Sequence, residues 1–344
     1  SSLTGQIRKS TQPSVPWITA SRAVTAVCAA IGPAPGRAIV PTAPAWKGTS
    51  PVIIGANACD WTAPTAQTEN TTMSTPDTNS YNAVLVGREE LNPQLQIMRV
   101  QPAAALFDFK PGQFAVLGLL GRESRVPEAD DEEPPAAPDK LIRRAYSIAS
   151  SSVEKHYVEF YVTLITSGQL TPRLFALPYG GRLFLGPKAS GMFTLDRVAP
   201  GKAVILIATG TGLAPYMSML RTMLVHDAER AFVVLHGARY SWDLGYRGEL
   251  ESLARIRANF TYIPSITRPD EDPHFRGHSG RIQTLLEKGI IETLSGVPLD
   301  PTQADIFLCG NPEMIRIVKE LLAPRGFKPD QGKEPGTIHV EEYW

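Results

Sequence analysis

The sequence predicts two folded domains, a small antiparallel β-barrel followed by a doubly wound α/β parallel sheet, with a disordered extension in front of them. Short strand-like segments with one helical stretch occupy residues 77–199, which is typical of a small barrel. Apolar strands alternate with helices through residues 200–344, as in a parallel sheet covered on both faces. Residues 1–76 show no sustained helical or strand periodicity.

Composition restricts the class of protein. A chain of 344 residues can form two ordinary domains, and 43% hydrophobic with 20% charged residues is normal for a globular protein. The 34 basic residues balance the 34 acidic ones, so we expect no general attraction to nucleic acid or to a membrane surface. The sequence has no apolar run near the roughly 20 residues that a membrane helix needs. We therefore expect a soluble protein, and we favour a monomer in the cytoplasm.

Cysteine usage argues against a metal centre on this chain. Cys28, Cys59 and Cys309 are widely separated, and a plant-type iron–sulfur cluster needs about four thiolates. Any iron–sulfur centre is therefore expected on another protein, and no metal site is predicted here. Three scattered cysteines also give no disulfide framework, which fits a reducing compartment.

Residues 1–76 are rich in Ala, Thr, Ser and Pro and carry more basic than acidic side chains. Such a segment cannot bury enough apolar surface to offset its ordering entropy, so we expect disorder. A leader or transit segment is the competing interpretation, and it would imply an organellar address. Met73 is a candidate internal start. The role of this extension stays open.

The barrel region contains strands separated by turn residues and one helix. Pro172 is suited to the first turn of that helix. Residues 122–139 form an acidic, proline-rich insertion, which we interpret as a surface loop. The expected strands are 83–86, 95–100, 114–120, 144–149, 157–165 and 183–185, and the expected helix is 171–177.

The second region begins near 198–201. Its expected strands are 204–208, 231–236, 260–265 and 305–309, and its expected helices are 214–226, 248–256, 280–288 and 312–322.

The first strand of this region ends in a glycine turn, residues 208–215. Gly210 and Gly212 stand between a buried strand and a helix, where backbone amides can face a pyrophosphate without obstruction by side chains. Pro215 occupies the position of the third glycine in the usual dinucleotide motif, which favours a nucleotide domain of another lineage. A tight strand-to-helix turn without a ligand is the alternative.

The residues after the next strands favour NADPH over NADH. Sites for NADH usually place a carboxylate after the second strand, whereas residues 236–240 contain no acid. Arg239, Arg268 and Arg281 follow successive strands and can converge on a 2′-phosphate. Each arginine taken alone is equally well explained as a solvated charge.

The segment Arg144-Ala145-Tyr146-Ser147 is suited to a flavin. In an extended strand Arg144 and Tyr146 share one face, and Ser147 lies on the other. The guanidinium can neutralise a cofactor phosphate, the phenol can stack, and the hydroxyl can reach a ring nitrogen. An ordinary strand with a half-buried tyrosine is the alternative.

Six motifs occur in the order found in bacterial-type ferredoxin–NADP⁺ (flavodoxin/ferredoxin) reductases, which residues 80–344 therefore resemble. They are Arg144–Ser147, Gly168–Leu174, Ala208–Pro215, His236–Tyr240, Cys309–Pro312 and Glu341–Trp344.

The resemblance implies specific roles. For FAD it implies Arg144, Ala145, Tyr146, Ser147, Tyr161, Val162, Leu170, Thr171 and Trp344, and for NADP it implies Thr209, Gly210, Thr211, Gly212, Arg239, Arg268 and Arg281. Ser147 would lie near flavin N5, with Tyr146 and Cys309 also at the reaction centre. The turn at Leu170 and Thr171 would hold the FAD pyrophosphate at the start of the short helix. Cys309 would position the nicotinamide, and a buried inert thiol is the alternative. The role of Glu341 stays open.

The resemblance further implies an FAD-dependent NADPH:ferredoxin or flavodoxin oxidoreductase. Hydride would move between nicotinamide C4 and flavin N5, and single electrons would pass to the external carrier. Two other enzymes remain open, the reductase component of an oxygenase system and a flavin or diaphorase-type reductase. A nucleotide-binding interaction module without catalysis is the third alternative.

Overall fold

We describe a computed structural model of the chain, in which residues 80–224, 226–331 and 334–342 are placed. The predicted extension 1–76, with Cys28 and Cys59, and the terminal Trp344 lie outside the described residues.

Six antiparallel strands form the first sheet, in the order β4-β3-β6-β1-β2-β5. They are β1 (Ala83–Asn92), β2 (Leu95–Pro102), β3 (Phe114–Leu120), β4 (Leu141–Ser147), β5 (Val158–Thr163) and β6 (Arg182–Leu185). An antiparallel bridge between Ile148 and Phe160 joins the end of β4 to β5, so the two outer strands of the sheet meet. The short helix α1 (Thr171–Ala176) follows β5. The predicted antiparallel barrel is confirmed.

Six parallel strands form the second sheet, in the order β10-β9-β8-β7-β11-β12. They are β7 (Ala203–Thr209), β8 (Phe232–Ala238), β9 (Phe260–Ile266), β10 (His278–Ser279), β11 (Ala304–Gly310) and β12 (Ile338–Glu342). The α-helices that follow these strands are α2 (Ala214–Met223), α3 (Arg247–Ile256), α4 (Ile282–Glu287), α5 (Ile290–Ser295) and α6 (Pro312–Leu322). The predicted doubly wound sheet is also confirmed.

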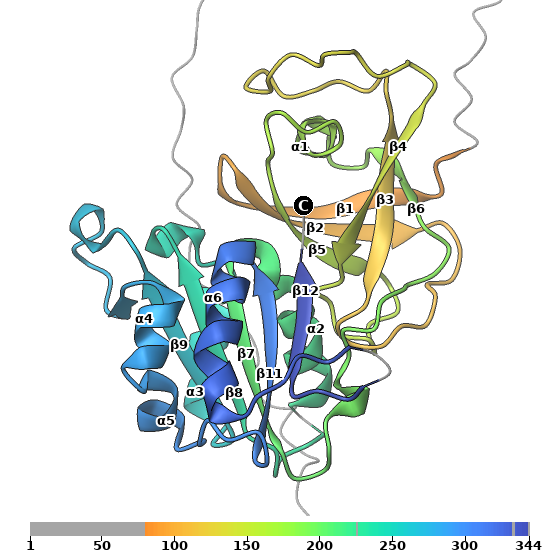
Figure 1. Cartoon of the computed structure of the whole chain (residues 1–344). Helices are drawn as coiled ribbons and strands as arrows, with labels where there is room; N and C mark the ends of the chain where they lie inside the picture. Colours follow the sequence, from red (N-terminus) through yellow and green to blue (C-terminus); the bar gives the residue numbers. More distant parts are fainter. Residues whose placement is uncertain (1–79, 225, 332–333, 343–344) are drawn as a thin grey trace, which may run out of the picture. The chain divides into compact units, whose positions relative to one another are not determined.

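Successive side chains of β7 enter two different cores. Val204 and Leu206 pack with the buried face of α2, whereas Ile205 and Ile207 pack with α4, α5 and α6. Figure 1 shows helices on both faces of this sheet. Because both faces are covered, the strand reads as a continuous apolar run, which is the pattern that predicted it. Within the described residues, no helix has the length and apolar character required to cross a membrane.

The structure changes two predicted helices and adds elements that were not predicted. The helix expected at 280–288 is α4, Ile282–Glu287, and it is followed by the unpredicted α5 after Gly289, whose φ of 64° lies in the left-handed region. The helix expected at 214–226 ends at Met223. Strand β12 was not predicted, although it pairs in parallel with β11 along its whole length.

Candidate functional site

The switch point of the parallel sheet lies between β7 and β11, since the chain runs outward from β7 to β10 and then returns to the other side of β7. Ligands of open α/β sheets bind beyond the carboxyl ends of the strands at such a point. The glycine turn follows β7 there as the 3₁₀ helix η3 (Gly210–Leu213) and leads into α2.

Close packing makes glycine necessary on both sides of the switch point. A Cβ atom on Gly212 would lie 2.3 Å from the backbone oxygen of Cys309, and one on Gly310 would lie 2.2 Å from Oγ1 of Thr209. The Asn311 backbone amide also donates to Thr209 Oγ1, at 2.8 Å. The structure thus brings the predicted turn 209–212 against the loop after β11. Gly210 has φ +54°, and a Cβ atom there would meet nothing within 4 Å.

The three predicted arginines come to one end of the sheet. The Arg268 backbone amide donates to the Arg239 carbonyl at 3.1 Å, and the Gly280 amide, one residue before Arg281, donates to Ile266 at 2.8 Å. The Arg268 guanidinium lies 5.4 Å from the ring centroid of Tyr240 and donates to its hydroxyl. These residues therefore form a cationic edge beside the glycine turn.

The nearest carboxylate after β8 belongs to Asp243, and it is engaged elsewhere. It accepts from Asn92 of the barrel at 3.0 Å and from the Tyr240 backbone amide at 3.3 Å. Burial raises the pKa of Asp243 above its ordinary value, against the smaller opposing effect of these bonds and of Arg239. The Asp243 carboxylate thus caps the turn that begins at Tyr240 and contacts the barrel. It does not occupy the role of the carboxylate that binds the ribose in NADH sites.

The end of β4 approaches the parallel sheet. Arg144 and Ala145 are exposed and Tyr146 is half-buried, with its ring 6.4 Å from Phe160 in an edge-on contact. Burial raises the pKa of Tyr146, so its hydroxyl stays protonated. Ser147 is buried, and its hydroxyl donates to Glu341 Oε2 at 3.0 Å.

Three predicted or candidate side chains meet at this place from three strands. The register of β12 on β11 sets Glu341 opposite Cys309, which is fully buried, and the same Glu341 receives the bond from Ser147. Prediction from sequence left Glu341 without a role because β12 was not recognised as a strand. The pairing of β12 with β11 is what brings Glu341 next to Cys309.

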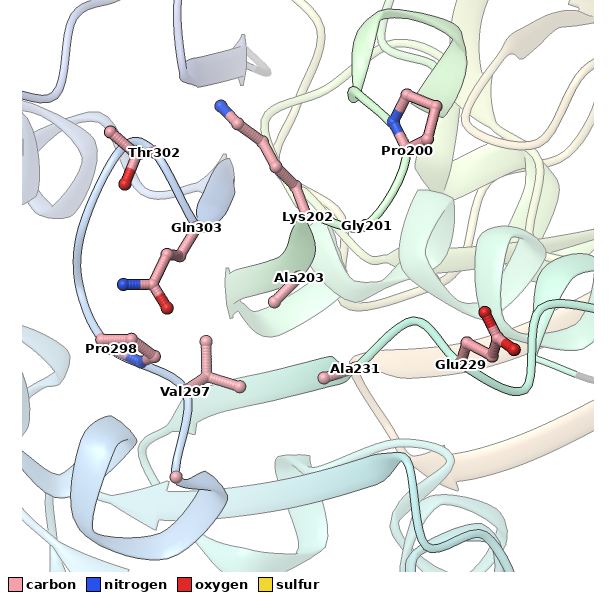
Figure 2. Close-up of a pocket in the computed structure, with 11 residues that line it drawn as sticks. Pro200, Gly201, Lys202, Ala203, Glu229, Ala231, Val297, Pro298, Thr302 and Gln303 are labelled. Atoms are coloured by element: carbon pink, nitrogen blue, oxygen red, sulfur yellow. The ribbon is translucent and has the colours of Figure 1, made fainter.

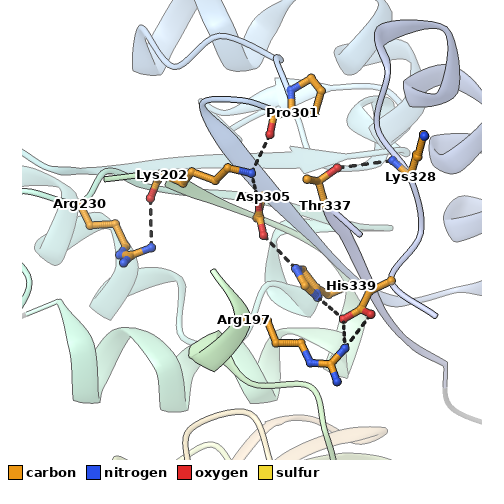
Figure 3. A network of polar contacts seen from close by, with 9 residues as sticks. Arg197, Lys202, Arg230, Pro301, Asp305, Lys328, Thr337 and His339 are labelled. Carbon is orange, nitrogen blue, oxygen red and sulfur yellow. Dashed lines mark hydrogen bonds and ion pairs between the residues drawn. The ribbon is translucent and has the colours of Figure 1, made fainter. Parts of the chain in front are cut away.

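A charged network holds β12 two residues before Glu341 (Figure 3). The His339 ring stacks on Phe307 at 4.3 Å, with Nε2 3.1 Å from Asp305 and Nδ1 3.3 Å from Asp330. Lys202 Nζ contacts Asp305 at 2.8 Å, and Arg197 contacts Asp330 at 2.7 Å. Burial raises the pKa of Asp305, but the bonds from His339 and Lys202 outweigh it, and the carboxyl titrates below its ordinary range.

Four predicted flavin residues have other documented contacts. The Tyr161 hydroxyl accepts from the Gly245 amide at 2.9 Å and donates to the Asp243 carbonyl at 3.2 Å. Val162 and Leu170 are buried in the barrel core. Thr171 Oγ1 exchanges hydrogen bonds of 3.0 and 3.1 Å with the Ile165 backbone. Their roles toward a flavin stay predictions.

A buried carboxylate that prediction from sequence missed joins the two sheets. Glu159 of β5 is 1% exposed and accepts from Arg221 of α2 at 2.6 Å, from Tyr246 at 2.9 Å and from Arg99 at 2.7 Å. Burial raises the pKa of Glu159, but Arg221, Arg99 and Tyr246 together outweigh burial, and the pKa lies below its ordinary value. The strand alternation placed Glu159 outside the barrel core, and the second sheet covers that face.

A pocket of ≈ 410 Å³ lies at the other end of the parallel strands from the glycine turn and shares Lys202 with the network around His339 (Figure 2). Its lining includes Lys202 and Ala203 before and at the start of β7, Ala231 before β8, and Gln303 before β11. The parallel strands place these residues at the amino ends, opposite the glycine turn. The pocket is therefore separate from the candidate dinucleotide site.

Comparisons with known proteins agree with this geometry. The family model described as oxidoreductase NAD-binding domain matches residues 206–320. A flavodoxin/ferredoxin–NADP reductase of Buchnera aphidicola subsp. Baizongia pistaciae is 32% identical over 242 residues, 70% of this chain and 90% of the relative. Ferredoxin–NADP reductase A of Sorangium cellulosum is 34% identical over 245 residues, 69% and 80% of the two chains.

A solved structure has the same fold. The ferredoxin NADP⁺ reductase from Neisseria gonorrhoeae with bound FAD and NADP aligns with a TM-score of 0.64 and 24% identity. The match covers 76% of this chain and 98% of that chain.

Proposed function

Because the chain belongs to the flavodoxin/ferredoxin–NADP reductase family, we propose that it is an FAD-dependent NADPH:ferredoxin or flavodoxin oxidoreductase. The observation that carries this proposal is the meeting of Ser147, Cys309 and Glu341 beside the glycine turn. Buried polar side chains from both sheets at one switch point are suited to a reaction between two cofactors. We place the protein in the bacterial cytoplasm as a monomer.

The residues present fit both cofactors. Gly212 lets the turn pack on the end of β11, and the open space at Gly210 lets the backbone approach a pyrophosphate. Arg239, Arg268 and Arg281 would supply charge for the 2′-phosphate of NADP. Exposed Arg144 can neutralise a phosphate of FAD, and Thr171 begins α1 near the same end of the barrel.

When bound, FAD accepts a hydride from NADPH and releases the electrons one at a time. The chain's own residues bind and orient. The Ser147 hydroxyl donates its one hydrogen to Glu341, so the serine oxygen is held in position and would act toward a bound flavin as a hydrogen-bond acceptor. Cys309 is fully buried near the end of β11, where its side chain would help to keep water away from the nicotinamide ring of a bound NADPH.

The carrier protein is tested by comparing electron acceptors. We expect NADPH-dependent reduction of a bacterial ferredoxin or flavodoxin to exceed that of free flavin in kcat/KM. Preferential reduction of free flavin would instead favour a flavin reductase, and preferential reduction of an oxygenase's own iron–sulfur component would favour the oxygenase role. Reduction of no acceptor by a flavin-loaded protein would contradict the proposal.

A further inference from the structure

The acidic insertion between β3 and β4, residues 122–139, has many exposed residues but is anchored to the barrel at several points. The Val126 amide donates to the Pro172 carbonyl at 3.2 Å, and the Asp130 amide donates to the Thr166 carbonyl at 3.1 Å. Thr166 Oγ1 donates back to Asp130 at 3.1 Å. Figure 1 shows the insertion looped over α1. The insertion is therefore packed on the segment that enters this helix.

One buried ion pair holds the insertion in place. The Arg173 side chain is 3% exposed and that of Glu132 is 8% exposed. The guanidinium binds the carboxylate in a fork, Nη1 to Oε1 at 2.5 Å and Nη2 to Oε2 at 3.0 Å. The Ala136 amide donates to the same carboxylate at 3.1 Å. A bidentate pair of this kind fixes orientation as well as distance.

The same guanidinium also holds the turn before α1. Arg173 Nη1 donates to the Gln169 carbonyl at 2.6 Å, and Nη2 donates to the Gly121 carbonyl at 2.7 Å. The planar fork thus joins the insertion, the end of β3 and the turn 168–171. That turn is the one expected to receive the FAD pyrophosphate. The Gln169 carbonyl of this turn is held by the Arg173 side chain, which Glu132 in turn keeps in position.

Removing the carboxylate charge would leave Arg173 buried without its counterion. Such a guanidinium moves toward water or another acceptor, because an unpaired buried charge is costly. Its bond to Gln169 would then weaken, and the turn would have to be ordered each time a ligand binds. A site that must be ordered on binding holds its ligand less tightly than one already formed.

We propose that Glu132 is a positioning residue for FAD: by fixing Arg173 it preforms the turn 168–171 for the dinucleotide's pyrophosphate. The inference rests on the proposed function. It also gives the insertion a role, that of a brace behind the phosphate-binding turn. We expect the effect on the phosphate half of the cofactor, since Glu132 contacts Arg173 of α1 and, within the insertion, Arg125 and the Ala136 amide.

The test compares two adjacent glutamates in the flavin-loaded protein. Glu132→Gln removes the charge of the buried pair, and Glu133→Gln makes the same chemical change at an exposed neighbour. FAD release after dilution is followed by the rise of flavin fluorescence. We expect release to be about tenfold faster in Glu132→Gln, as for the loss of one charge-assisted positioning contact, and unchanged in Glu133→Gln.

Two further readouts separate positioning from general damage. The visible spectrum of bound flavin and the rate of its reduction by saturating NADPH should be unchanged in Glu132→Gln. Glu132→Asp, which keeps the charge on a shorter side chain, should release FAD at an intermediate rate. The inference would be overturned if Glu132→Gln released FAD at the wild-type rate. It would also be overturned if faster FAD release came with an altered flavin spectrum or with slower flavin reduction. A wild-type protein that binds no FAD would instead overturn the proposed function.

Discussion

Ser147 and Glu341 lie 194 positions apart in the chain and share a hydrogen bond of 3.0 Å. The serine was predictable because it ends a short motif on a recognisable strand. Its partner was not, because a glutamate near a chain end has no periodic pattern that distinguishes it from a solvated charge. For single residues, the motifs predicted which side chains belong to the site, whereas the contacts between those side chains became known only from the fold.

Removing the Ser147 hydroxyl tests this pair. We expect Ser147→Ala to slow flavin reduction by NADPH about 10- to 100-fold while FAD stays bound, since a polar group that Glu341 holds in position at the reaction centre is lost. Anaerobic stopped-flow absorbance measures the rate. Ser252→Ala on α3 is the matched control, because the Ser252 hydroxyl donates to Gly248 and accepts from Arg255 within the same helix. An unchanged rate in Ser147→Ala would remove this residue from the mechanism.

The Glu132 carboxylate predicts a pH dependence. The hydrogen bond from Arg173 lowers its pKa to about 2, against the opposing effect of burial. Because the pKa in the folded state is below the ordinary value of 4.5, the stabilisation is complete above pH 4.5 and declines as the pH falls toward 2. Urea unfolding should show Glu132→Gln less stable than wild type at pH 6, with the difference shrinking below pH 4.5. A constant difference would contradict it.

Some helices and strands could be predicted from their own residues, and others could not. Strands β7, β8 and β11 are continuous apolar runs, and α6 begins where the Asn311 side chain caps the Glu313 and Met314 amides, so these were predicted within a few residues. Strand β12 has five residues and carries a histidine and two glutamates. Its pairing with β11 and its charged network stabilise it, and neither is visible in a local pattern.

The network around His339 should therefore control β12. A neutral imidazole donates from one nitrogen and a charged one from both, and Asp305 and Asp330 face the two nitrogens. We expect His339→Ala to accelerate hydrogen exchange in residues 338–342 and to slow flavin reduction about as much as Ser147→Ala. His339→Asn should be intermediate. Wild-type exchange in His339→Ala would show that strand pairing alone holds β12; exposed His156 provides the control substitution.

At the scale of the whole described unit, the two sheets share one hydrophobic core. Leu95, Ile97 and Tyr161 of the barrel pack with β7 and α2. The sequence predicted two separate domains correctly in type and order, but alternation in β5 could not show that its polar face would be covered. That burial depends on the second sheet, which lies far along the chain.

Glu159 tests this junction. We expect Glu159→Gln to lower the free energy of unfolding by about 3 kcal/mol, because Arg221 and Arg99 both lose their buried anionic partner and Arg221 keeps only its pair with Glu249. Urea denaturation followed by fluorescence measures the loss, with exposed Glu128→Gln as the control. We also expect slower flavin reduction by NADPH, since Tyr246 and Arg221 no longer hold the barrel against the parallel sheet. Wild-type stability would exclude this role.

The central claim is that one chain passes hydride from NADPH to its own flavin. Anaerobic titration of the purified protein with NADPH and NADH, followed by flavin absorbance, tests it most directly. We predict bound flavin that is bleached by about one equivalent of NADPH and much more slowly by NADH, with the preference for NADPH lost in Arg281→Ala. A protein without flavin, or a bound flavin that NADPH does not bleach, would contradict the account.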